Sequence, residues 1–143
     1  MIDDVYNRKI LELAGNIPRL GRLDRPQASA TAQSRLCGSV ITVDLVLDGD
    51  RVADFAHDVK ACALGQASAS VLARNVVGAT TAEIRAAREA VRAMLKDDGP
   101  PPEGRFADMA HLEPVRDYKA RHASTLLPFD ATLAAIEKAE AGA

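Results

Sequence analysis

The hydrophobic pattern at the start of the chain has the spacing of an α-helix. Apolar residues recur every three to four positions over residues 2–14, and a Gly-Asn pair followed by a proline ends the pattern. The members of the apolar face are Ile2, Val5, Tyr6, Ile10 and Leu13. We therefore predict an amphipathic helix over residues 2–14, which needs another part of the domain to pack against.

The next three segments read as extended. They are residues 28–33, 39–47 and 52–59, and the second places Ile41, Val43, Leu45 and Leu47 on one face. Asp48-Gly49 stands between the second and third segments, which is a sequence typical of a tight hairpin turn. We therefore predict a β-hairpin with a further strand before it.

After Cys62 the period becomes helical again. Small residues around Ala67 and Ser68 predict a closely packed helix that stops at Gly78, and Thr80 with Glu83 forms the signature of a capping box for the next helix. Residues 96–119 have weak periodicity and predict an ordered, partly helical excursion. We expect Pro128 in the first turn of a last helix and a frayed C-terminal tail. The inward-facing residues of that helix would be Phe129, Leu133 and Ile136.

This order of elements predicts an α+β fold, with a three-stranded antiparallel sheet covered on one side by helices. The open face of the sheet should be polar. The chain has 143 residues, of which 48% are hydrophobic, so it can bury one core, and we expect a single domain over 1–143.

Charge and composition exclude several classes of function. A net charge of −2 and an isoelectric point near 5.9 provide no positive field for nucleic acid. The first residues are acidic where a secretory leader would be basic, and no apolar run is long enough to span a membrane. We expect a cytoplasmic protein without a membrane partner. In a reducing compartment Cys37 and Cys62 should not form a structural disulfide.

Cys37 and Cys62 are the candidates for chemistry. Each stands at the mouth of a loop, one at the entry to a strand and the other just before a helix whose dipole favours negative charge. They are too far apart in the sequence for a CxxC site, so a metal site would need separate elements to meet. The alternative is that both are small buried hydrophobic residues.

The three histidines have different contexts. His57 shares a strand face with Phe55 and is expected to be a core or interface residue, and His111 is expected to be solvated. His122 stands at the turn before the last helix, where its imidazole could replace a missing metal ligand. No catalytic triad, carboxylate pair or phosphate-binding loop stands out, so we do not expect an enzyme.

Several motifs in the same order make the chain resemble the NifU/IscU-like family of iron-sulfur cluster assembly scaffolds. The resemblance extends from Val5 to Ile136 and rests on Val5-Tyr6-Asn7, Pro18 to Leu23, Leu36-Cys37-Gly38, the Asp48-Gly49 hairpin and Ala61 to Ser70. The long interval after Cys62 is similar to the SUF-type U branch, and residues 96–119 would be the insertion of that branch. The resemblance implies a SufE/NifU-like fold.

The resemblance also implies a ligand set that this chain carries only in part. Family members bind a cluster or zinc through three cysteines and commonly an aspartate two residues after the first. Cys37 and Cys62 match the first two cysteines, whereas Ser39 stands in place of the aspartate and Ser124 in place of the third cysteine. Because a serine hydroxyl is a poor ligand for zinc or iron, weak and labile binding is expected.

The same resemblance implies roles for residues near the last helix and for partners. Arg121 would stabilise thiolate charge at the site, and the family's chaperone-binding segment is replaced by Tyr118-Lys119-Ala120-Arg121. A cysteine desulfurase is the implied partner, and the chain would be a monomer or a weak homo-oligomer.

Three functional hypotheses follow. The first, which we prefer, is a scaffold or sulfur-transfer protein that handles iron, zinc or a labile iron-sulfur cluster at Cys37 and Cys62. The coordination of the metal or cluster would be completed by His122, by water, by a second copy of the chain or by the donor enzyme. The second is a binding module without a cluster that docks on a cysteine desulfurase or another assembly protein. The third is an unrelated fold with two buried thiols, which the order of the motifs disfavours.

Overall fold

The computed structural model describes residues 7–35 and 38–142. The elements, labelled as in the figures, are α2 (Arg8–Gly15), β1 (Ala28–Gln33), β2 (Val40–Asp48), β3 (Arg51–Lys60), α3 (Ala63–Asn75), α4 (Thr81–Lys96), the 3-10 segments η1 (Gly104–Asp117) and η2 (Lys119–Arg121), and α5 (His122–Gly142). Residues 1–6, the first part of the predicted helix 2–14, lie outside the described residues.

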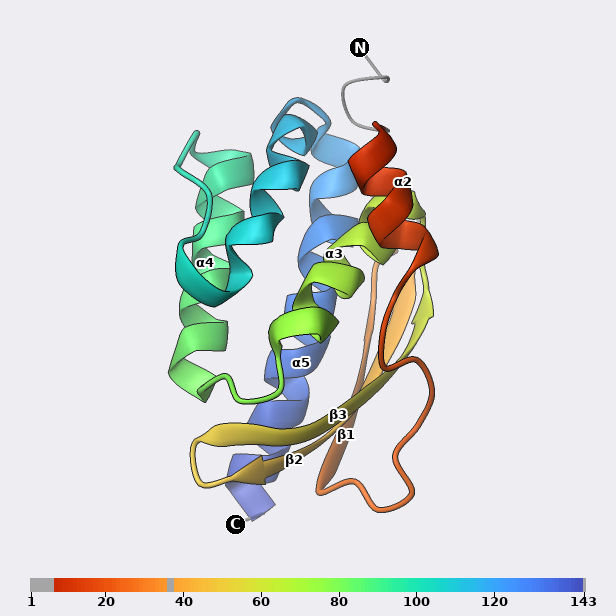
Figure 1. Ribbon diagram of the computed structural model, residues 1–143, viewed down its shortest axis with the longest axis vertical. Helices are drawn as coiled ribbons and strands as arrows, with labels where there is room; N and C mark the ends of the chain where they lie inside the picture. The colour runs from red at the N-terminus through yellow and green to blue at the C-terminus, as the bar shows by residue number, and fades with distance from the viewer. Residues whose placement is uncertain (1–6, 36–37, 143) are drawn as a thin grey trace.

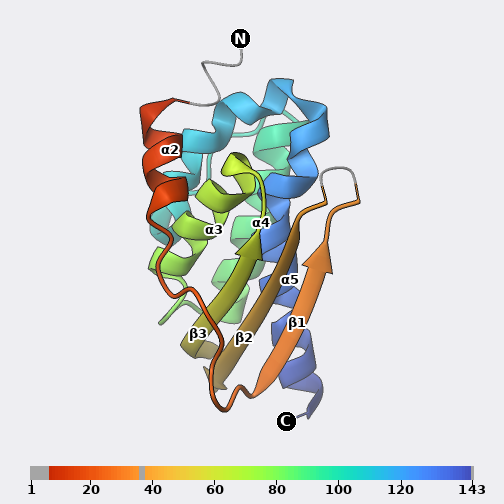
Figure 2. The same ribbon diagram turned by 90° about the vertical axis from the view of Figure 1, so that its right-hand side faces the viewer.

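The three strands form one antiparallel sheet in the order β1-β2-β3. The predicted hairpin between β2 and β3 is present, but its two turn residues are Gly49 and Asp50, one position later than the predicted Asp48-Gly49. Gly49 has φ +62°, a backbone conformation that glycine adopts without steric cost. The helices gather on one face, and α5 runs behind the sheet along β1 and β2 (Figures 1 and 2). The predicted α+β fold is confirmed.

The core lies between the sheet and the helices and is almost entirely aliphatic. Alternate residues of β2 point into it, namely Ile41, Val43 and Leu45, each fully buried. Few aromatic side chains contribute, and two of them, Phe106 and Phe129, meet edge to face with ring centroids 5.8 Å apart. On the opposite face Thr31 and Thr42 pair across strands with their hydroxyls 2.9 Å apart, so that face is polar as predicted.

Asp44 anchors the long loop between α2 and β1 to the sheet. Its fully buried carboxylate accepts hydrogen bonds from Arg22 Nε at 2.7 Å and Nη2 at 3.0 Å, from the Leu23 N–H at 3.0 Å and from the Ser29 hydroxyl at 2.5 Å. Burial alone would raise the pKa of Asp44, but these hydrogen bonds outweigh it and hold the pKa below its ordinary value. The sequence pattern did not indicate this role.

His57 is a fully buried histidine in the middle of β3, which agrees with its expected place in the core. Its Nε2 lies 2.9 Å from the Pro18 carbonyl and donates to it, so the neutral ring holds the loop after α2 against the edge of the sheet. The backbone continues this contact, because Gly21 N–H donates to His57 O and His57 N–H donates to Arg19 O. Burial lowers the pKa of His57 below its ordinary 6.5.

The lowered pKa of His57 predicts that the folded protein loses stability as the pH falls below about 6.5. The unfolded chain then binds a proton that the folded chain excludes, so the free energy of unfolding decreases toward pH 5.5, by about 1 kcal/mol. Urea unfolding at pH 7.5, 6.5 and 5.5 measures this decrease. A His57→Gln variant should lose most of the dependence and a His111→Gln control should keep it; an identical dependence in all three proteins would contradict the assignment.

Two helices have different bounds from those predicted. Helix α3 ends at Asn75, three residues before Gly78, which instead adopts φ +91° in the connection to α4. Helix α5 begins at His122, so the prediction that Pro128 lies in its first turn is wrong. Pro128 is inside the helix, where it lacks an N–H for the Ser124 carbonyl. The tail, predicted to fray, is helical to Gly142. In α5, tertiary packing of the buried face overrides two local signals, the proline at position 128 and the weakly patterned tail.

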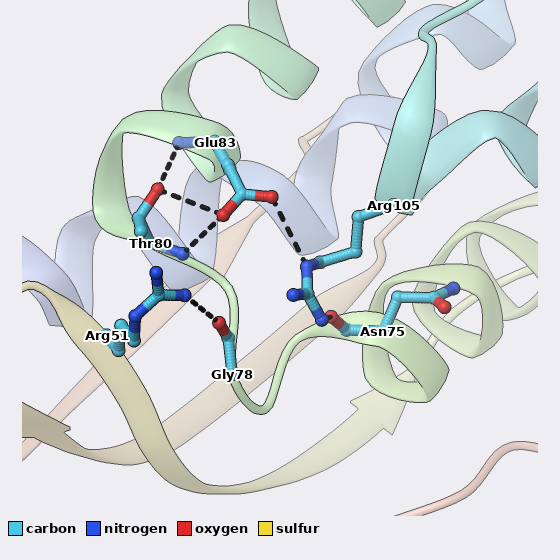
Figure 3. A network of polar contacts seen from close by, with 6 residues as sticks. All are labelled: Arg51, Asn75, Gly78, Thr80, Glu83 and Arg105. Carbon is cyan, nitrogen blue, oxygen red and sulfur yellow. Dashed lines mark hydrogen bonds and ion pairs between the residues drawn. The ribbon is translucent and has the colours of Figure 1, made fainter.

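The predicted capping box of α4 is present and belongs to a larger network (Figure 3). The Thr80 hydroxyl accepts from Glu83 N–H at 3.0 Å, and Glu83 Oε1 accepts from Thr80 N–H at 3.1 Å. The Arg105 Nε donates to Glu83 Oε2 at 3.3 Å, and its Nη1 donates to the Asn75 carbonyl at the end of α3. The start of η1 is thereby tied to the ends of two helices.

Replacing Thr80 by alanine should lower the free energy of unfolding by about 1 kcal/mol, because the first turn of α4 loses its side-chain acceptor. The melting temperature should fall by about 3 °C for a domain of this size. A Thr80→Ser variant keeps the hydroxyl and should melt within about 1 °C of the wild type. Equal melting of the alanine and serine variants would argue against the cap.

Candidate functional site

Cys62 stands where β3 ends and α3 begins. It is the N-cap residue of α3, with extended backbone angles and no hydrogen bond from its side chain to the helix, and it is half-buried with a free thiol. Its carbonyl accepts the Gln66 N–H at 2.9 Å, and the Gln66 side-chain amide donates to the Ala61 carbonyl at 2.9 Å. The polypeptide around the thiol is therefore fixed, and Cys62 itself is partly buried against the hydrophobic core.

Cys37 lies outside the described residues, so the structure does not place its thiol. The described residues beside it belong to the connection between β1 and β2. Ser34 N–H donates to the Ser39 carbonyl at 2.8 Å, and Gly38 N–H donates to the Ser34 carbonyl at 2.9 Å. Ser39, which is 2% exposed, precedes Val40, and Val40 pairs with Lys60 at the end of β3. This connection and Cys62 therefore share one end of the sheet.

Ser124 lies in the first turn of α5 and packs against the first turn of α3. A Cβ atom on Gly65 would lie 3.3 Å from the Ser124 carbonyl oxygen and 3.7 Å from the Ser124 Cβ. One turn further along α3, the Ser68 hydroxyl donates to the Thr125 carbonyl at 2.6 Å. Ser124 is fully buried, so its side chain is enclosed close to the helix that Cys62 starts.

The close approach at Gly65 predicts a strong effect of one added methyl group. In Gly65→Ala the new Cβ would lie 2.9 Å from the Ala61 Cβ, which forces a shift of the backbone. We expect a net loss of about 1–2 kcal/mol in unfolding free energy, although alanine is the better helix former. In the control Gly15→Ala the new Cβ meets nothing within 4 Å. Chemical denaturation that shows Gly65→Ala at least as stable as the wild type would exclude the close packing.

His122 is buried, and its ring is engaged with the backbone of η1. Its Nε2 lies 3.1 Å from the Val115 carbonyl and 3.0 Å from the Arg116 carbonyl. Since both partners are acceptors, Nε2 carries the proton and donates to them. Ligation of a metal through Nε2 would break these contacts. The geometry favours a role in which His122 fixes the turn before α5.

Arg121 is half-exposed at the last position of η2, directly before α5. Its backbone is fixed at both ends, because its N–H donates to the Tyr118 carbonyl at 2.9 Å and its carbonyl accepts from the Thr125 hydroxyl at 3.1 Å. Within the described chain its guanidinium makes no hydrogen bond or ion pair, so it is available to an anionic group at this end of the domain.

The described residues contain no group of three or more His, Cys, Asp or Glu side chains placed to hold a metal ion. What they do provide at this end is one free, half-buried cysteine, Cys62, and two enclosed serines, Ser39 and Ser124. Such a set can bind a soft metal through sulfur but leaves coordination positions open. The small residues of this helix predicted close packing, but the sequence did not indicate that Gly65 would be the point where α5 approaches.

None of the helices within residues 7–35 and 38–142 has the length and hydropathy needed to cross a membrane.

Comparison with known proteins assigns this fold to a class of small α+β domains. The crystal structure of a nitrogen-fixing NifU-like protein (N-terminal) from Brucella abortus is 63% identical, covers 99% of both chains and superposes with a TM-score of 0.97. A putative SUF-system iron-sulfur cluster assembly scaffold protein from Fervidobacterium islandicum has the same fold, with a TM-score of 0.85 at 21% identity over 94% of this chain and 98% of its own.

The sequence comparison agrees. The iron-sulfur cluster assembly scaffold protein IscU of Thermotoga maritima is 25% identical over 134 residues, which are 94% of each chain. The profile of the NifU-like N terminal domain matches residues 5–125, so the chain belongs to that family.

Proposed function

We propose that this protein is a scaffold or sulfur-transfer protein of iron-sulfur cluster assembly, with iron, zinc or a labile cluster as its cargo at Cys37 and Cys62. The observation that carries the proposal is the position of Cys62, a half-buried residue with a free thiol at the start of α3, at the same end of the sheet as the β1–β2 connection. Membership of the NifU-like N terminal domain family supports it, as does the similarity to a protein named as an assembly scaffold.

In this proposal the protein is not an enzyme, because its residues hold and pass on cargo. The two cysteines would provide thiolate ligands, and the guanidinium of Arg121 would stabilise their negative charge. Ser39 and Ser124 occupy the remaining family positions with hydroxyls, which are largely protonated at neutral pH. The coordination shell would then be completed by water, a second copy or the sulfur donor, and the cargo would exchange readily.

The partner in this proposal is a cysteine desulfurase in the cytoplasm, which supplies the sulfur. The open coordination positions are what such a donor needs, since a site with four protein ligands leaves none for the incoming group. The protein itself would be a monomer or a weak homo-oligomer, and the partner would bind the end of the sheet where Cys62 lies.

The burial of both serines favours a second candidate. Ser39 and Ser124 are 2% and 0% exposed, and without thiolates this part of the site is close-packed protein. A family member that has lost the cluster could retain the domain as a docking module for the assembly machinery. The two candidates differ in one measurable property, the metal that the cysteines bind.

Metal analysis distinguishes the scaffold from the docking module. Protein purified anaerobically without added metal should contain well under one zinc or iron per chain, and should stay folded in chelator because the aliphatic core does not depend on an ion. Titration with zinc should show weak binding that is lost in Cys62→Ala. The double variant Ser39→Asp/Ser124→Cys restores the family's ligand types and should raise zinc affinity by orders of magnitude.

The matched control is Ser39→Asp/Ala123→Cys, which has the same number of thiols but places the new one a residue earlier on α5, a rotation of about 100° around the helix. It keeps the restored aspartate but lacks the thiol at position 124, so its zinc affinity should stay well below that of the Ser39→Asp/Ser124→Cys variant. If the wild type binds no zinc and the restored variant binds it tightly, the docking module is the correct candidate. Stoichiometric metal that survives chelator in the wild type would contradict the incomplete site.

A further inference from the structure

A second feature of the same end of the domain is a basic hollow between α4, the 3-10 segments and α5. Two adjoining pockets of about 320 Å³ and 250 Å³ share three lining residues, Lys96, Lys119 and His122. We call them together the lysine hollow. Its lining residues come from α4, the 3-10 segments, α5 and the end of β1. In Figure 1, α4 lies on the side of α5 away from α2.

The charge balance of the lysine hollow is positive, although the chain as a whole has a net charge of −2. The Arg88 guanidinium is neutralised by Asp130, with Nε and Oδ1 2.9 Å apart. The Arg116 guanidinium is also paired, with its Nη1 3.7 Å from Asp98 Oδ1 and its Nη2 3.7 Å from Glu113 Oε2. Lys96 and Lys119 make no side-chain hydrogen bond or ion pair with any described residue. Two uncompensated ammonium groups therefore share one concave site.

The lining of the hollow is apolar as well as charged. Leu126 and Leu127 of α5, which are 4% and 5% exposed, line the larger pocket, and Leu95 lines the smaller one. The hollow therefore offers an apolar surface beside positive charge.

The lysine hollow also adjoins the cysteine end of the sheet. Ser34, which lines the larger pocket, is the residue whose carbonyl and N–H close the turn to Gly38 and Ser39. Ala123 lines the same pocket and directly precedes Ser124. A segment bound in the hollow would therefore lie next to both the β1–β2 connection and the first turn of α5.

We propose that the lysine hollow is a docking site for an acidic peptide segment of a partner protein, one that presents aspartate or glutamate on either side of a large aliphatic residue. The carboxylates would pair with Lys96 and Lys119, and the aliphatic side chain would cover the leucine floor. A peptide fits better than a small anion, because the hollow combines separated charges with apolar surface. The proposal does not depend on whether the cysteines bind metal.

The probe is a fluorescein-labelled peptide, Asp-Glu-Leu-Asp-Glu with blocked ends, whose binding to the full-length protein is measured by fluorescence anisotropy at low salt. The neutral analogue Asn-Gln-Leu-Asn-Gln should bind at least tenfold more weakly. In Lys96→Glu/Lys119→Glu the affinity for the acidic peptide should fall at least tenfold, and in Lys96→Arg/Lys119→Arg it should be kept. The control Arg8→Glu/Lys9→Glu makes the same change of net charge on exposed residues of α2 and should bind within about twofold of the wild type.

Circular dichroism confirms that each variant is folded. Because charge pairing contributes to the binding, the affinity for the acidic peptide should also fall when the sodium chloride concentration in the assay is raised from about 20 to about 300 mM. An equal loss of affinity in the Arg8→Glu/Lys9→Glu control would show that the peptide is attracted by the overall charge of the protein, and it would overturn the proposed site. So would unchanged binding in Lys96→Glu/Lys119→Glu or an acidic peptide that does not bind the wild type. Competition by inorganic phosphate as strong as by unlabelled peptide would also overturn it, in favour of a small-anion site.

Discussion

The structure depends on the close packing of the first turns of α5 on the first turns of α3. The contact is possible because Gly65 has no side chain where the Ser124 carbonyl approaches, and because Ser68 donates to the Thr125 carbonyl one turn later. Pro128, inside α5, supplies no N–H to the preceding turn, and the Ser124 carbonyl oxygen of that turn lies close to Gly65 of α3. The same contact brings Ser124 near the helix that begins at Cys62 and sets one wall of the lysine hollow.

Much of the fold could be predicted from local patterns. The strands and the hairpin followed from alternation and from Asp48-Gly49, and the start of α4 followed from Thr80 and Glu83, because each of these signals is satisfied by neighbours in sequence. The start of α5 was misplaced because its first turn is stabilised by contacts with α3 and η1, which lie far away in the chain. The anchoring role of Asp44 was not predicted for the same reason, since its partners Arg22 and Leu23 belong to the loop between α2 and β1 and are distant from it in the sequence.

In the candidate site, too, local features could be predicted from the sequence and features made by distant segments could not. Cys62 could be placed from sequence, because the change from strand to helix period marks the junction that it occupies. The lysine hollow could not, because Lys96 and Lys119 belong to different elements and each is an ordinary surface residue in its own segment. The resulting picture is an end of the domain with three properties together: a half-buried free cysteine, two enclosed serines and a positive hollow. A carrier with an incomplete ligand set and a partner held beside it would combine all three.

The central claim is that Cys37 and Cys62 belong to one site, and disulfide mapping tests it most directly. Reduced, metal-free protein at low concentration is treated with a mild thiol oxidant, and its peptides are analysed by mass spectrometry. Two thiols able to share one ion, with zinc–sulfur bonds of about 2.3 Å, are close enough to be joined. The account predicts a Cys37–Cys62 disulfide within single chains, formed at a rate independent of protein concentration. Only disulfides between chains, or two thiols that remain free in the oxidised protein, would contradict it.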